Sequence, residues 1–372
     1  MQHGIKRQHL TENAKQLKLQ KDEKKIINYQ QLTNYILQLR DNDTYTQDAF
    51  NDTTNLLILN PEFYTIWNYR REILLHLYKS DQGKVNDIDT YAQVLTDDLQ
   101  FVLSQLKKYP KCYWIWNHRS WCLFELVEID RVSWAYEFGV VSKLLEMDQR
   151  NFHGWQYRRF VVENIEREAI KKTEPGKGNI ALLKINLDEF AYTTSKVQKD
   201  FSNFSAWHNR AKLIPKVYDL VHSLTDGIPE EYQEQCQLFQ DSFSILQHDL
   251  DMIKTGIYMS PEDTSVWSYL YWLLTDEFFM KGYKEVGSYL KVLEQQVEEI
   301  SELNELEKED HNGIDNIWCL KSIIFIKALI QREKNEPILT DYIKESLKTL
   351  TEIDPLRKGR YLDQLSGKAA IL

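Results

Sequence analysis

Glycine and proline are scarce in this sequence of 372 residues, with 13 and 8 occurrences. An average chain carries about 7 % glycine and about 5 % proline, so both helix-breaking residues stand near half their usual share. An all-β sandwich or barrel needs frequent turn residues, which this chain does not supply. The scarcity therefore disfavours a β fold, and it also disfavours collagen-like or low-complexity sequence.

Long apolar runs and clustered cysteines are also missing. No run of about 18 apolar residues is present, so we expect no transmembrane segment. The first residues are polar and charged rather than apolar, so we expect no signal peptide. The four cysteines form no Cys-x-x-Cys pair, and the nine histidines form no His-x-x-x-His pair. We therefore expect a cytoplasmic protein without a disulfide framework and without a metal site of its own.

Positive charge is in deficit, because 46 lysines and arginines face 56 aspartates and glutamates, for a net charge of −10. A negative field repels the phosphate backbone, so nucleic acid is not an expected partner. Hydrophobic residues reach 42 % and aromatic residues 12 %, including ten tryptophans. That composition is sufficient for a large core and argues against intrinsic disorder.

A repeated motif accounts for most of the tryptophans. Its fullest form is Pro-x-x-(Tyr/Phe)-x-x-Trp-x-x-Arg, and the tryptophans of successive copies are 39 to 60 residues apart. The copies are centred on Trp67, Trp116, Trp155, Trp207, Trp267 and, in a degenerate form, Trp318. The fifth copy has Leu270 and the sixth has Lys321 where the others have arginine.

Each copy predicts a hairpin of two helices. An apolar-periodic stretch precedes the motif, as in residues 49–59 and 99–106. Asn60-Pro61 and Tyr109-Pro110 then end the first helix, because the residue before proline is pushed out of the helical region. One hairpin cannot bury its apolar faces alone, so hairpins stack. We therefore expect an all-α fold, a right-handed α-solenoid of stacked antiparallel helix hairpins, forming a single domain over residues 1–372.

The tryptophan and arginine of the motif lie three residues apart, on one face of the second helix. The simplest interpretation is structural: the tryptophan is the core anchor between helix layers, and the arginine satisfies polar groups at the seam. This set comprises Trp67, Arg70, Trp116, Arg119, Trp155, Arg158, Trp207 and Arg210. The motif thus indicates the architecture without locating a chemical site.

The repeated motif resembles that of the α subunits of protein prenyltransferases, over residues 49–321. Within that family the chain most resembles the α subunit of Rab (type II) geranylgeranyltransferase. The supporting stretches are residues 1–7, 60–63, 109–119 and 151–155. In the last of these the farnesyltransferase type typically has Asn-Tyr-His-Ala-Trp, so Phe152 favours the Rab type.

The resemblance implies an obligate heterodimer in which this chain wraps a β subunit. That partner would hold the isoprenoid pocket and the catalytic zinc. The implied reaction transfers geranylgeranyl from geranylgeranyl diphosphate to C-terminal cysteines of Rab GTPases, with a Rab escort protein as a further partner. Zinc lowers the pKa of a bound thiol, and the leaving diphosphate must be stabilised by cations. An α subunit can assist that second step.

The candidate catalytic cations are Lys111 and Arg150. Each lies five residues before its tryptophan, so stacking would place the two side by side. In the resemblance, a diphosphate-contacting lysine of the farnesyltransferase type corresponds to position 150, and the Rab type assigns the role to position 111. The alternative is that both are solvated surface cations. Which of the two dominates at the diphosphate is left open.

Tyr113 and Phe152, two residues further on, are the candidate substrate-binding side chains, as walls near the diphosphate or the peptide. The alternative for them is a hydrophobic staple onto the helix. His3 could reach a partner's metal, and the alternative is a tail histidine without a role.

Two other functions stay open at this point. One is the shared α subunit of farnesyltransferase and type I geranylgeranyltransferase, which would act on Cys-a-a-X proteins. The other is a non-catalytic helical-repeat adaptor, against which the 39 to 60 residue spacing argues. Neither the Rab substrates nor the isoprenoid specificity can be inferred from this chain.

Overall fold

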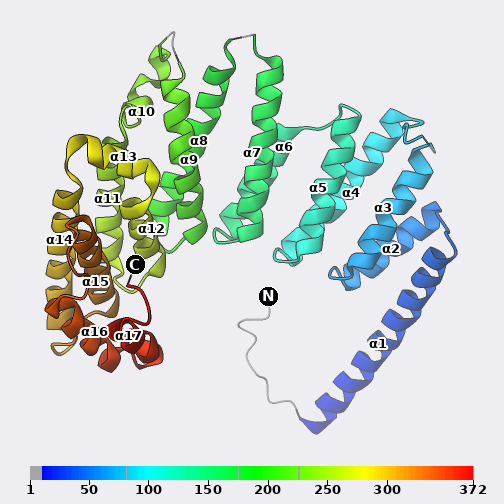
Figure 1. Ribbon diagram of the computed structural model, residues 1–372. Helices are drawn as coiled ribbons and strands as arrows, with labels where there is room; N and C mark the ends of the chain where they lie inside the picture. Colours follow the sequence, from blue (N-terminus) through cyan, green and yellow to red (C-terminus); the bar gives the residue numbers. More distant parts are fainter. Residues whose placement is uncertain (1–10, 81, 175, 225–226, 372) are drawn as a thin grey trace. The chain divides into compact units, whose positions relative to one another are not determined.

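The computed structural model describes residues 11–80, 82–174, 176–224 and 227–371 (Figure 1). Over these ranges the regular backbone is helical, and the extended pairing is limited to an isolated bridge between Lys79 and Val85. The all-α prediction is confirmed. A search of the described helices finds none with the length and apolar character needed to cross a membrane.

The chain divides into two compact units that meet between Ile165 and Glu166. The prediction of a single domain stays a prediction. The first unit contains a long N-terminal helix, two complete hairpins and the start of a third (Figure 1). Its helices are α1 (Glu12–Asp41), α2 (Gln47–Leu59), α3 (Tyr64–Tyr78), α4 (Ile88–Lys108), α5 (Tyr113–Glu128), α6 (Trp134–Met147) and the beginning of α7 (Phe152–Lys172).

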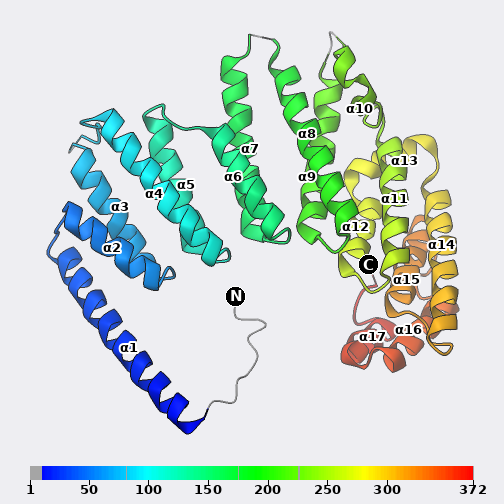
Figure 2. The same ribbon diagram turned by 180° about the vertical axis from the view of Figure 1, so that it is seen from behind.

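The second unit continues the hairpin pattern, as the reverse view shows (Figure 2). Its paired helices are α8 (Gly178–Lys199) with α9 (Phe204–His222), α11 (Ser242–Met259) with α12 (Thr264–Thr275), α14 (Tyr289–Asp310) with α15 (Ile317–Glu333), and α16 (Asp341–Ile353) with α17 (Lys358–Leu365). Shorter helices connect them: η1 (Glu230–Tyr232), α10 (Gln233–Gln237), α13 (Glu277–Val286) and η2 (Pro355–Arg357).

The turn inside each hairpin forms where the motif predicts it. Asn60 and Tyr109 end α2 and α4 with non-helical ψ angles of 87° and 61°, each directly before a proline. The next helix then begins with the residue four before the tryptophan as its N-cap. In three hairpins, Asn151, Asn203 and Asp263 fill that place and accept backbone N–H bonds.

The motif tryptophans are buried and fasten this turn. In five hairpins the indole N–H donates to the backbone carbonyl six residues earlier. The pairs are Trp67 with Pro61 (2.9 Å), Trp116 with Pro110 (2.9 Å), Trp155 with Gln149 (2.8 Å), Trp207 with Phe201 (2.8 Å) and Trp267 with Pro261 (2.8 Å). The same side chain therefore fills the core and pairs a carbonyl that the turn would leave unbonded.

Three of the four motif arginines join one hairpin to the next. The guanidinium of Arg119 in α5 donates to both carboxylate oxygens of Glu137 in α6, at 2.7 and 2.9 Å. It also donates to the carbonyl of Leu99. Arg70 in α3 likewise bonds Asp98 in α4. These side chains are almost fully buried, and the planar guanidinium suits the two carboxylate oxygens.

A second helix completes each of these networks. Tyr157 in α7 donates to Glu137, and His118 in α5 bonds Asp98, both at 2.7 Å. In the second unit the equivalent carboxylate is that of Asp249. It accepts hydrogen bonds from Arg210 and Tyr269 at 2.6 to 2.8 Å. Each buried carboxylate is thus paired with an arginine of the preceding hairpin and hydrogen-bonded by a side chain of its own hairpin, which fixes how the two hairpins stack.

We predict that Arg119→Met strongly destabilises the chain, because Glu137 is left charged and unpaired in the core. The expected loss of unfolding free energy is about 3 to 5 kcal/mol. Arg131→Met is the matched control, since Arg131 forms an exposed pair with Asp89 at 3.3 Å, and its loss should stay below about 0.5 kcal/mol. Urea unfolding measures both, and equal losses would contradict the role given to Arg119.

We predict that protonation of the Asp249 carboxylate destabilises the folded chain at low pH. Burial alone would raise its pKa, but the charge and hydrogen bonds of Arg210 outweigh burial and lower that pKa from 3.8 to about 2. The carboxylate therefore contributes stability above pH 4, about 2 kcal/mol, which disappears as the pH falls toward 2. In urea unfolding, Asp249→Asn should be less stable than the parent chain at pH 7, with the difference shrinking toward pH 2. A difference independent of pH would refute this.

Candidate functional site

The candidate cations lie in the turns between the helices of two successive hairpins of the first unit. Lys111 stands between Pro110, whose carbonyl accepts the indole bond, and Cys112, the N-cap of α5. Arg150 stands between Gln149 and Asn151 in the same way. Both cationic side chains are exposed. In the other three complete copies the equivalent position holds Glu62, Ser202 or Glu262, so positive charge occurs there in these two hairpins alone.

The turns are tied to each other through their carbonyls. Pro61 accepts a hydrogen bond from Trp67 in its own hairpin and another from the Cys112 thiol of the next, at 3.3 Å. Pro110 accepts in the same way from Trp116 and from Asn151, whose amide is 2.9 Å away. Burial raises the pKa of the Cys112 thiol to about 11, so the thiol keeps the proton it donates.

Asn151 performs two tasks. Besides donating to Pro110, its side-chain oxygen accepts from the backbone N–H groups of His153 (3.0 Å) and Gly154 (3.2 Å), which start α7. It is buried, with 4 % of its surface exposed. The residues on either side of each cation are therefore held in place, and the cation itself points to solvent.

Lys111 borders a hollow of about 680 Å³ that is formed by the ends of α4 and α6 and the turns after them. Its ammonium lies 3.6 Å from a carboxylate oxygen of Asp148, and 70 % of the Lys111 side chain is exposed. An ion pair this long and this exposed is weak, so an incoming anion can replace the carboxylate. The lining residues are Glu62, Leu106, Lys107, Tyr109, Pro110, Lys111, Cys112, Trp116, Leu144, Met147, Asp148 and Asn151.

The two candidate wall residues belong to a row of aromatic rings. Tyr113 and Phe152 are the first residues of α5 and α7, and both are exposed. His153 lies between them, with ring centroids 6.0 Å from Tyr113 and 4.0 Å from Phe152. Burial lowers the pKa of His153, so the ring is neutral at pH 7 and adds no charge to the row.

Trp114 and Tyr64 extend this row in the other direction. The ring centroid of Trp114 lies 5.3 Å from Tyr113 and 5.0 Å from Tyr64, the first residue of α3. The described residues thus place an aromatic surface beside the turns that carry the cations. Such a surface suits an apolar group attached to an anion.

Several of these contributors were missed from the sequence. Asp148 belongs to no repeated motif position. Asn151 and Cys112 occupy the same position of two motif copies, but their side chains differ. The available signal for Asn151 and Cys112 was position, because these two residues lie four residues before a motif tryptophan, where an N-cap is expected. His3 lies outside the described residues.

A buried trio, Asp98, His118 and Cys122, has the composition of a metal-ligand set. Its atoms are already engaged, since His118 accepts from Arg71 at 3.1 Å through Nδ1 and donates through Nε2 to Asp98. Burial lowers the pKa of His118, in keeping with a neutral ring. Asp98 also receives the guanidinium of Arg70, a cation that a metal ion would oppose. This trio is a polar network of the core and does not fit a metal.

Comparison with known proteins first defines the class. A family model described as "Protein prenyltransferase alpha subunit repeat" matches residues 46–77, 95–126, 134–165, 186–217 and 246–276, each match containing one motif tryptophan. The fold is also similar to a chain of Candida albicans protein geranylgeranyltransferase-I complexed with GGPP, with a TM-score of 0.55, 20 % identity, and 92 % and 91 % of the two chains covered.

Full-length relatives narrow the assignment. "Geranylgeranyl transferase type-2 subunit alpha" of Candida albicans is 58 % identical over 100 % of this chain and 99 % of its own length. The Saccharomyces cerevisiae protein of that name is 36 % identical, with 98 % of each chain covered. The Rattus norvegicus protein of that name is 31 % identical over 73 % of this chain and 41 % of its own length. The chain belongs to the family of type-2 geranylgeranyl transferase α subunits, as its motifs predicted.

We predict that Asn151→Ala loosens the turn that carries Lys111, because the Pro110 carbonyl loses one of its two donors and two N–H groups of α7 lose their side-chain acceptor. The expected loss of unfolding free energy is about 1 to 3 kcal/mol. Hydrogen exchange should also quicken at residues 152–155. Asn51→Ala is the control, since the exposed side chain of Asn51 accepts a hydrogen bond from Gln47 within its own helix. Unchanged hydrogen exchange at residues 152–155 in Asn151→Ala would contradict the role given to Asn151.

Proposed function

We propose that this chain is the α subunit of a heterodimeric enzyme that transfers geranylgeranyl from geranylgeranyl diphosphate to C-terminal cysteines of Rab GTPases presented by an escort protein. The observation that carries the proposal is full-length similarity to proteins named type-2 geranylgeranyl transferase α subunits. The chain wraps a β subunit, and the pair is active only together.

Zinc held by the β subunit would lower the pKa of the Rab cysteine and so favour its thiolate form. That sulfur attacks the first carbon of the isoprenoid, the carbon–oxygen bond breaks, and its electrons pass to the diphosphate. The charge that develops on the diphosphate is where this chain contributes, because preorganised cations stabilise a leaving group best when their positions are already fixed.

Lys111 and Arg150 supply these cations. Their neighbours Pro110, Cys112 and Asn151 are held by hydrogen bonds to adjacent hairpins, so little reorganisation accompanies the reaction. The diphosphate replaces Asp148 as the partner of Lys111, since two or more negative charges attract the ammonium more than one carboxylate does. Tyr113 and the neighbouring Phe152 form the apolar wall.

Co-expression with candidate β subunits tests the function. Transfer of a C20 group to a Rab protein that requires an escort protein supports the proposal. Escort-independent prenylation of a short Cys-a-a-X peptide would overturn it in favour of the shared α subunit of farnesyltransferase and type I geranylgeranyltransferase. A stable complex with no transfer to either substrate would favour a non-catalytic adaptor.

We predict that Lys111→Ala lowers the rate of prenyl transfer at least about tenfold, as loss of one charge-stabilising group should. The heterodimer should still form, because Lys111 is exposed and its ion pair is weak. Lys108→Ala is the control, since Lys108 is an exposed cation of the same segment that does not line the hollow. Single-turnover rates of the purified heterodimers measure the effect, and normal turnover in Lys111→Ala would overturn the assignment.

A further inference from the structure

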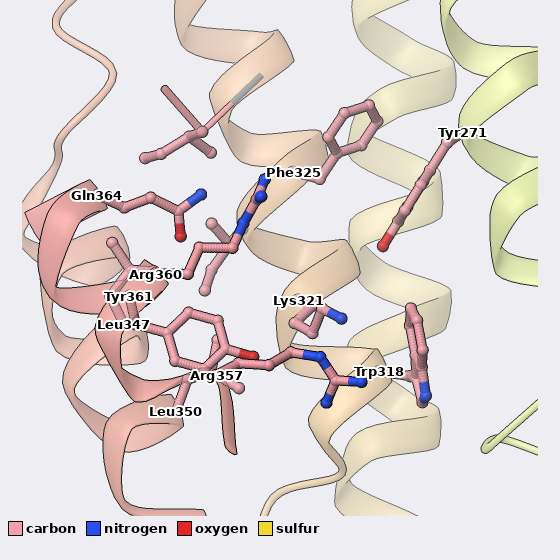
Figure 3. A pocket seen from close by; sticks show the side chains of 12 residues that line it. Tyr271, Trp318, Lys321, Phe325, Leu347, Leu350, Arg357, Arg360, Tyr361 and Gln364 are labelled. Carbon is pink, nitrogen blue, oxygen red and sulfur yellow. The ribbon is translucent and has the colours of Figure 1, made fainter. Parts of the chain in front are cut away.

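The second unit contains a hollow of about 480 Å³ between α15, the α16–α17 hairpin and α12 (Figure 3). Its walls combine three cationic side chains with aromatic and aliphatic ones. The lining residues are Tyr271, Trp318, Lys321, Ile324, Phe325, Leu347, Leu350, Arg357, Arg360, Tyr361, Gln364 and Ile371.

The three cations come from three elements, of which η2 and α17 are consecutive and α15 lies earlier in the sequence. Lys321 lies on α15, Arg357 in η2 and Arg360 on α17. In Figure 3 the amine of Lys321 and the guanidinium of Arg357 both reach toward Trp318, and Arg360 extends into the same space. The Lys321 ammonium lies 3.8 Å from the centroid of the Trp318 ring.

These positive charges are poorly compensated. Asp354 pairs with Arg357 at 3.0 Å and also accepts the hydroxyl of Tyr361 at 2.6 Å, so its oxygens are engaged. Within the described part of the chain, no carboxylate lies within 4.0 Å of Lys321 or Arg360. Burial, and then the charges of the two arginines, lower the pKa of Lys321, as mutual repulsion among three cations would.

The remainder of the wall is apolar. Leu347, Leu350 and Ile324 are buried beneath the hollow, and the rings of Tyr271 and Phe325 stand 4.4 Å apart at its side. The Tyr271 hydroxyl is already bonded to Ser322 at 2.8 Å, so this side offers an apolar ring face. A ligand that fits both parts has an anionic group joined directly to an apolar one.

We propose that this hollow binds the phosphate group of a phosphate ester whose apolar portion rests against Trp318 and Phe325. A phosphate ester carries up to two negative charges, which matches the uncompensated cations better than a single carboxylate does. Arginine binds phosphate oxygens in pairs, and lysine binds them as a point charge. The site goes beyond the proposed transferase function and does not depend on it.

Titration of the full-length chain, co-purified with its β subunit, with n-hexyl phosphate tests the proposal by calorimetry. Lys321→Gln combined with Arg360→Gln should weaken binding at least about tenfold, because charge-assisted bonds are lost. The single variant Arg360→Gln, at an exposed side chain, should weaken binding even if the double variant folds poorly. Lys344→Gln with Lys348→Gln is the control, since it removes the same charge from exposed positions on α16.

Equal affinity in all of these proteins, or no saturable binding to the parent protein, would overturn the proposal. Vesicles of phosphatidylcholine with and without phosphatidylinositol 4-phosphate separate the two sources of the phosphate. Binding to the phosphoinositide vesicles that Arg360→Gln abolishes identifies a lipid headgroup. Binding of the soluble ester without vesicle binding identifies a free phosphate ester.

Discussion

The buried bond between a motif arginine and a carboxylate on the following hairpin is the interaction on which each unit depends. Arg119 and Glu137 illustrate it, with two short bonds and almost no exposure to solvent. Removing two charges from water is costly, and geometry of this quality is required to offset the cost. A slip of one helix past its neighbour would leave both charges buried and unpaired. The bond therefore specifies the register in which hairpins stack.

The register also sets how successive turns meet. Because hairpins stack in one way, the carbonyl of one turn meets the N-cap side chain of the next, as Pro110 meets Asn151. The residue between the bonded carbonyl and the N-cap of each turn differs from copy to copy. It is acidic or polar in most copies, and cationic at Lys111 and Arg150. A rigid scaffold thus carries a variable rim, in the way that loops carry function on stable folds.

The sequence was sufficient to predict the hairpins and the family. The repeated tryptophans and the Asn-Pro and Tyr-Pro pairs that end helices are recognised within a few consecutive residues. Insertions in the loops between copies therefore do not obscure them. The carboxylate partners could not be predicted, because variable loops place Asp98, Glu137 and Asp249 at separations of 28, 18 and 39 residues from their arginines. The separation between arginine and carboxylate therefore follows no fixed pattern that a sequence could reveal.

The candidate site also has features that the sequence predicted and features that it did not. Equivalent offsets predicted that Lys111 and Arg150 occupy matching turns. The Asp148 partner and the aromatic row depend on tertiary packing between hairpins, which sequence position does not reveal.

The most direct measurement is an experimental structure of the chain with its β subunit and an unreactive analogue of geranylgeranyl diphosphate. We expect a phosphate oxygen about 3 Å from the Lys111 ammonium, with Asp148 displaced from it. A diphosphate bound beyond hydrogen-bonding distance of both Lys111 and Arg150 would contradict the catalytic role proposed for these cations.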